Sequence, residues 1–116
     1  MHVLQYHKSL SIEKWSMYPK MQQVLMISNE LNRAKNWILK NQNLEANLAY
    51  ERAFELIYLT LADNKWLNTS KELFRLKETL GELYCQETKD LKKNNLCLQL
   101  LLTFTTESYN LLANYN

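Results

Sequence analysis

Glycine and proline are almost absent from this chain of 116 residues, which contains one of each. Sheet proteins need these residues at many tight turns, whereas a helical bundle has few turns and excludes both from its helix interiors. Hydrophobic residues make up 47% and charged residues 22% of the chain, which is typical of a folded domain. The sequence therefore predicts an all-α protein, an antiparallel bundle of about four helices that forms a single domain over residues 1–116.

The hydrophobic spacing locates the first two long helices. Pro19 suits a first helical turn, and the apolar pattern continues from there to about Asn41. A second helix is expected over residues 44–62, where small residues let a neighbouring helix approach closely. Residues 1–17 are expected to be a loosely ordered N-terminal segment. The first helix has one apolar seam, and the second helix has a seam of small residues with an apolar seam beside it. These seams are Val24, Ile27, Leu31, Ala34 and Ile38, then Ala46, Ala49, Ala53, Leu56 and Thr60, then Tyr50, Phe54, Ile57 and Leu61.

Polar residues mark the boundaries of the last two helices. Residues 63–68 are expected to form a loop, after which Thr69 and Glu72 have the spacing of a capping box. Asp90 is expected to cap the N-terminus of the last helix, which is predicted over residues 91–113.

The last helix has an unusual charge distribution. After Lys93 its only charged side chain is Glu107, and leucine, phenylalanine and tyrosine cover much of its circumference. A helix that is apolar on most sides is buried on most sides, either at the centre of the bundle or against another chain. Because each helix of a four-helix bundle normally keeps one face in water, we favour a homo-oligomer that forms through the last helix.

Residue types that carry catalytic and metal chemistry are scarce. The two histidines, His2 and His7, lie near the N-terminus, far in sequence from Cys85 and Cys97, so nothing indicates a Cys–His nucleophilic pair. A single glycine does not make a phosphate-binding loop, and the E-x-x-H motif of bundle metal sites is absent. The sequence predicts a protein that is not an enzyme, with no catalytic residues, no metal and no cofactor.

Each of the three arginines stands three positions from a glutamate. The pairs are Glu30 with Arg33, Arg52 with Glu55, and Glu72 with Arg75. Residues three apart share a helix face, so these pairs can be solvated surface contacts worth about 0.2–0.5 kcal/mol each. Alternatively, the guanidinium groups converge on a carboxylate or phosphate, which the planar arginine fork suits. We favour the structural interpretation, and the candidates for binding a partner or an anion are Arg33, Arg52, Arg75, Glu30 and Glu55.

Lysines form a second group of candidates. Lys89, Lys92 and Lys93 gather at the start of the last helix, and Lys35 is close to Trp37. Lysines at a helix N-terminus attract phosphate, so these four are candidates for nucleic-acid binding. The net charge of +2 does not by itself indicate nucleic acid, and we favour ordinary solvated lysines.

Three runs of sequence carry a resemblance to known proteins. They are I-x-x-E-L-x-R-A from Ile27, Y-E-R-A-F-E-L-I from Tyr50 and E-L-F-R-L-K-E from Glu72. Together they resemble a family of short, uncharacterised prokaryotic helical proteins. The helical hairpin is similar, more coarsely, to the HEPN superfamily, whose members are often RNases or toxin–antitoxin components. Their catalytic motif has a histidine four to six residues after an arginine, and no arginine here has one.

These features together define the expected function. We expect a non-enzymatic binding and assembly module, an oligomerising bundle that serves a protein or nucleic-acid partner. The alternatives are a HEPN-like toxin–antitoxin component associated with RNA, or a nucleic-acid-binding accessory protein of a retroelement, which it resembles in size and class. Residues 1–14 lack the apolar run of a secretory signal, and polar residues interrupt the apolar stretch over 96–112. We therefore expect no membrane association and a cytoplasmic location in a bacterium or archaeon.

Overall fold

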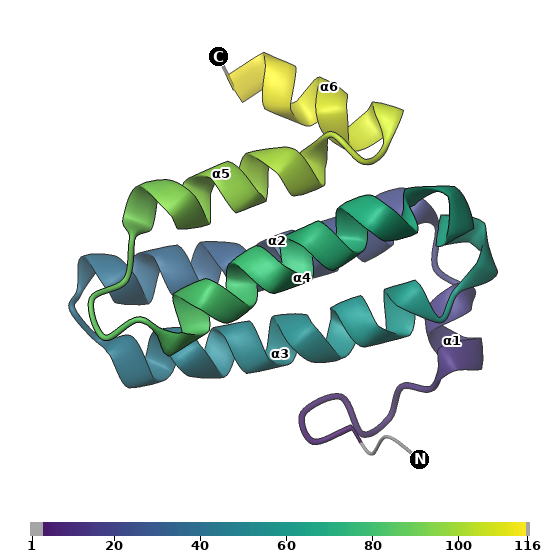
Figure 1. Cartoon of the computed structure of the whole chain (residues 1–116). Coiled ribbons are helices and arrows are strands. Elements are labelled where there is room, and N and C mark those ends of the chain that lie inside the picture. Colours follow the sequence, from purple (N-terminus) through teal and green to yellow (C-terminus); the bar gives the residue numbers. More distant parts are fainter. Residues whose placement is uncertain (1–3, 116) are drawn as a thin grey trace.

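The computed structural model of the chain describes residues 4–115, and the side chains of residues 4–111 (Figure 1). Within this part there are six α-helices, one 3-10 helix and no strand. The elements are α1 (Ile12–Ser16), α2 (Lys20–Leu39), α3 (Asn43–Leu61), η1 (Asn64–Thr69), α4 (Ser70–Cys85), α5 (Leu91–Leu102) and α6 (Thr106–Tyr115). The prediction of an all-α protein is confirmed, although the helices outnumber the four expected.

The helices α2 to α5 follow one another in alternating directions (Figure 1). Helix α2 packs against α3 and α5, and α4 also packs against α3 and α5, so the four enclose a common core. The core contains most of the predicted seams, because eleven of their fourteen residues are buried and the other three, Ile38, Phe54 and Leu61, are partly buried. The hydrophobic spacing of α2 and α3 therefore identified the buried faces of both helices.

The N-terminal segment is attached to the bundle rather than loosely ordered over residues 4–17. Ser11 caps α1 by accepting the N–H of Lys14, and the indole of Trp15 is fully buried. Its Nε1 donates to Thr60 Oγ1 of α3 at 3.0 Å, and Gln23 Nε2 of α2 donates to its carbonyl at 2.7 Å. Residues 1–3 of the predicted segment lie outside the described residues.

The predicted last helix is two helices, because the chain turns at residues 103–105. Thr105 Oγ1 accepts the N–H of Ser108, and Ser108 Oγ donates to the carbonyl of Leu102 at 2.7 Å. Hydroxyl groups that bond to nearby backbone groups compete with the helical pattern and favour helix ends. The apolar content of residues 96–112 concealed this polar break, and the prediction of one helix over 91–113 was wrong.

The two predicted caps have different outcomes. Asp90 accepts the N–H of Lys93 at 3.1 Å, so the predicted cap of α5 is confirmed. Thr69 makes no capping hydrogen bond with its side chain, because η1 runs directly into α4 and Ser70 donates to the carbonyl of Leu67 instead. The capping box predicted from Thr69 and Glu72 is therefore wrong.

Candidate functional site

A buried carboxylate joins α2 to α3. The side chain of Glu30 is 4% exposed, and it accepts hydrogen bonds from Arg33 Nη1 at 2.5 Å and from Arg52 Nε at 2.9 Å. Arg33 extends into solvent, whereas Arg52 is mostly covered. Two guanidinium groups therefore compensate one buried acid, and this part of the arginine cluster is an internal ion-pair network.

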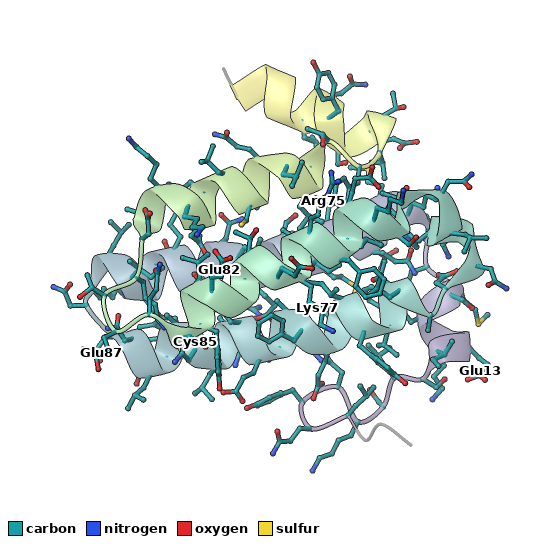
Figure 2. The ribbon with its side chains drawn as sticks, viewed as in Figure 1. Glu13, Arg75, Lys77, Glu82, Cys85 and Glu87 are labelled. Atoms are coloured by element: carbon teal, nitrogen blue, oxygen red, sulfur yellow. The ribbon has the colours of Figure 1, made fainter. Side chains whose placement is uncertain are left out.

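The other two members of the predicted cluster lie elsewhere. Arg75 projects from the exposed edge of α4 nearest α5, and it forms no ion pair with any acid in residues 4–111 (Figure 2). Glu55 bonds to the N-terminal segment instead of Arg52. The structure therefore does not gather the three arginines around one ligand, and the expected Arg52–Glu55 and Glu72–Arg75 ion pairs are absent from the described residues.

Glu55 holds the N-terminal segment against α3. Its carboxylate accepts three successive backbone N–H groups, from Gln5 at 2.5 Å, from Tyr6 at 3.1 Å and from His7 at 3.0 Å. The His7 ring Nδ1 lies 3.0 Å from the same carboxylate. One helix turn earlier, Glu51 accepts the hydroxyl groups of Tyr6 and Tyr84. This attachment, which we name the N-terminal clasp, tethers Gln5, Tyr6 and His7 to α3.

The clasp should open in acid. Burial by itself would raise the pKa of Glu55, but the hydrogen bonds from Gln5, His7 and Tyr6 outweigh burial and hold the pKa below its ordinary value. A carboxyl whose pKa is lowered by folding stabilises the fold above its unfolded pKa, and this contribution disappears as the pH falls through the folded pKa. We expect the amide protons of residues 5–7 to lose protection from exchange between about pH 5 and about pH 3.

Glu55→Gln should produce the same loss at neutral pH, measured by amide exchange relative to the intrinsic rates. Glu51→Gln is the matched control, since the backbone N–H groups of residues 5–7 bond to Glu55 and not to Glu51, and a glutamine oxygen can still accept the tyrosine hydroxyl groups. Amides of residues 5–7 that stay protected in Glu55→Gln would contradict this account.

The candidate lysines do not form one exposed group. Lys89 is buried, and its amine donates to the carbonyls of Leu83, Tyr84 and Gln86 at 2.8, 2.8 and 2.6 Å. Burial lowers the pKa of this amine. Lys93 pairs with Glu82 of α4 at 2.7 Å. The prediction of Lys89 as a solvated, phosphate-attracting lysine is therefore wrong.

Of the other two lysines proposed for nucleic acid, Lys92 is exposed and Lys35 is partly buried, and neither forms an ion pair with a described acid. The structure leaves Lys92 as the exposed, unpaired member of the four candidates. One exposed lysine is too little to define a nucleic-acid surface, because such surfaces neutralise several phosphates.

The outer face of α5 presents apolar side chains to solvent. Leu96 is 58% and Leu100 43% exposed, and they stand one helix turn apart. Their neighbours on this face, Gln99 and Thr103, are exposed and uncharged. Soluble proteins usually cover such a stripe of neighbouring apolar side chains, so this face is the candidate functional site.

Other features that could hold a ligand are modest. A hollow of about 360 Å³ lies between Pro19–Met21 and Phe104–Glu107, where α2 begins next to the start of α6. No group of three or more His, Cys, Asp or Glu side chains in the described part of the chain could hold a metal ion. None of the described helices is long and apolar enough to cross a membrane.

Comparison with known proteins gives no match to a family model, a curated protein or a solved structure. The resemblance to the HEPN superfamily therefore stays a prediction from the sequence.

Proposed function

We propose that the protein is a binding and assembly module that associates with copies of itself through the outer face of α5. The observation that carries this proposal is the exposed pair Leu96 and Leu100, on a helix with no charged side chain between Lys93 and its end at Leu102. Covering apolar surface is the main favourable term in protein association. A second chain is the simplest cover, because the same stripe on both partners is apolar and self-complementary.

The free energy that this face can contribute to association is modest. Fully burying a leucine contributes about 1.5–3 kcal/mol, and Leu96 and Leu100 are already half covered within the chain. Association also costs several kcal/mol in lost translational and rotational freedom. We therefore expect weak self-association, with a dissociation constant on the order of hundreds of micromolar, and not a permanent oligomer.

Leu96→Asp is expected to abolish this association. The new carboxylate would have to lose its water at the centre of the interface, which is costly when no partner charge is present. Sedimentation velocity from about 10 to about 500 μM should show concentration-dependent dimer or larger species for the parent, and monomer for the variant.

The matched control is Leu67→Asp, which makes the same change at a leucine of η1 that is 71% exposed. It should associate as the parent does, and circular dichroism should show that both variants are folded. A parent chain that stays monomeric throughout, or an equal effect of the two substitutions, would exclude α5 as the assembly surface.

A further inference from the structure

Among the exposed charged side chains of α4, the four that share one face are ordered by sign, whereas Glu72 and Lys77 lie outside this row. Lys71, Arg75, Glu78 and Glu82 follow one another along a single exposed face of α4, at spacings of four, three and four residues. The two bases occupy the N-terminal half of this face and the two acids the C-terminal half. Figure 2 shows Arg75 and Glu82 on the edge of α4 nearest α5, whereas Lys77 lies on the edge toward α3. We name this row the bipolar stripe.

The bipolar stripe and the leucine stripe are centred at the same level of the bundle. Helices α4 and α5 run in opposite directions, and the 2.7 Å contact between the side chains of Glu82 and Lys93 places these two residues near the same level. Because the helices are antiparallel, each step forward along α5 from Lys93 corresponds to one step back along α4 from Glu82. By this count, the midpoint of Leu96 and Leu100 lies level with Lys77. The midpoint of Arg75 and Glu78 is about half a residue away, which is less than 1 Å along a helix.

We infer that the partner of this face is a second copy of the chain, docked in the opposite direction about a two-fold axis. This inference rests on the proposed function. The axis lies in the interface and crosses both helices at right angles, between Arg75 and Glu78 on α4 and between Leu96 and Leu100 on α5. It places α4 on α4 and α5 on α5 of the second copy, as an isologous dimer requires.

The charges of the bipolar stripe complement one another in this arrangement. Arg75 meets Glu78 of the second copy, and Lys71 meets its Glu82, which also pairs with Lys93 of its own chain, so four pairs of opposite sign form across the axis. Leu96 packs on Leu100 of the second copy in the same way. A two-fold axis parallel to the helices would place α4 on α5 of the second copy and lose all four pairs. Complementary charges mainly select orientation, while the leucines supply the affinity.

The area of the face agrees with a weak dimer. Two helices of 16 and 12 residues give a surface about 20 Å long and about 20 Å wide, so the dimer would bury on the order of 800 Å² in total. Stable complexes usually bury about 1,200–2,000 Å². The dimer should therefore be measured at high protein concentration and low salt, where screening of the charges is smallest.

Charge reversal tests the orientation. Arg75→Glu and Glu78→Arg each convert two attractive pairs into two repulsive ones, and each should raise the dimer dissociation constant about tenfold or more by sedimentation equilibrium. The double variant Arg75→Glu/Glu78→Arg restores both pairs with their signs exchanged, and it should dimerise as the parent does. Lys77→Glu is the matched control, because it reverses a charge on the same helix outside the bipolar stripe.

The outcomes separate this inference from the proposed function. Suppose that each single reversal changes the dissociation constant no more than Lys77→Glu does, while Leu96→Asp still abolishes association. This result would overturn the antiparallel dimer and leave α5 as the assembly surface. A double variant as weak as the singles would also overturn it. A parent that is monomeric at every concentration would overturn both. Thermal melts of all variants should match the parent, since the four residues of the stripe are exposed.

Discussion

Trp15→Ala is expected to lower the free energy of unfolding by about 3–5 kcal/mol, the cost of removing a large buried aromatic side chain. The indole is fully buried, and it fastens the five-residue helix α1 to α3 through its bond to Thr60. Removing it leaves a cavity and takes one hydrogen-bond donor away from the Thr60 hydroxyl, which still donates to the carbonyl of Leu56. Urea unfolding followed by circular dichroism measures the change, and the slope of the transition shows whether the denatured state is altered.

Trp37→Ala provides the comparison for this prediction. It removes the same side chain from the partly buried edge of α2, where the ring contacts the amine of Lys40. A surface change of this kind should cost about 1 kcal/mol or less. A loss at Trp15 as small as the loss expected at Trp37 would mean that the N-terminal segment contributes little to the core.

Arg52→Ala is expected to cost about 2–4 kcal/mol. It leaves the buried carboxylate of Glu30 with Arg33 alone, and Arg33 extends into solvent. Removing one partner of a buried ion pair usually costs about 3–5 kcal/mol, and the remaining guanidinium should offset part of that loss. If the arginines served instead to crowd positive charge around a bound anion, their removal would leave stability unchanged or higher.

A thermal melt decides the sign of the effect. Arg75→Ala is the matched control, because Arg75 is exposed and has no ion pair among the described residues, so its removal should change stability by no more than about 0.5 kcal/mol. If the Arg52→Ala variant is as stable as the Arg75→Ala variant, the ion pair between Glu30 and Arg52 does not stabilise the fold.

The long helices could be predicted because their signal is local. Most seam residues predicted in α2 and α3 are buried, and Ile38, Phe54 and Leu61 are partly buried, since a spacing of three and four residues defines one helix face wherever the helix packs. The division between α5 and α6 depends on Thr105 and Ser108 bonding to backbone groups of their own turn. Thr105 and Ser108 lie within an apolar stretch of sequence, and the helical spacing of the leucines continues on both sides of them.

The candidate site residues were harder to place because their partners are backbone groups. The carboxylate of Glu55 is held by N–H groups of Gln5, Tyr6 and His7, and the amine of Lys89 by carbonyls at the end of α4. Every residue type offers such groups, so no sequence pattern marks them. The Arg33–Glu30 pair was predictable, because its spacing lies within one helix, whereas the contact from Arg52 crosses between two helices.

Lys89 also helps to keep the outer surface of α4 and α5 in the arrangement that a partner would bind. A face shared by two helices is usable only if the helices do not slide along one another, and here the chain that links α4 to α5 is bonded to the end of α4 through three carbonyls. The linker therefore acts as a fixed spacer. Because the leucines and the sorted charges are already level before any encounter, docking would need little ordering of the chain, and orientation would be the main constraint on the association rate.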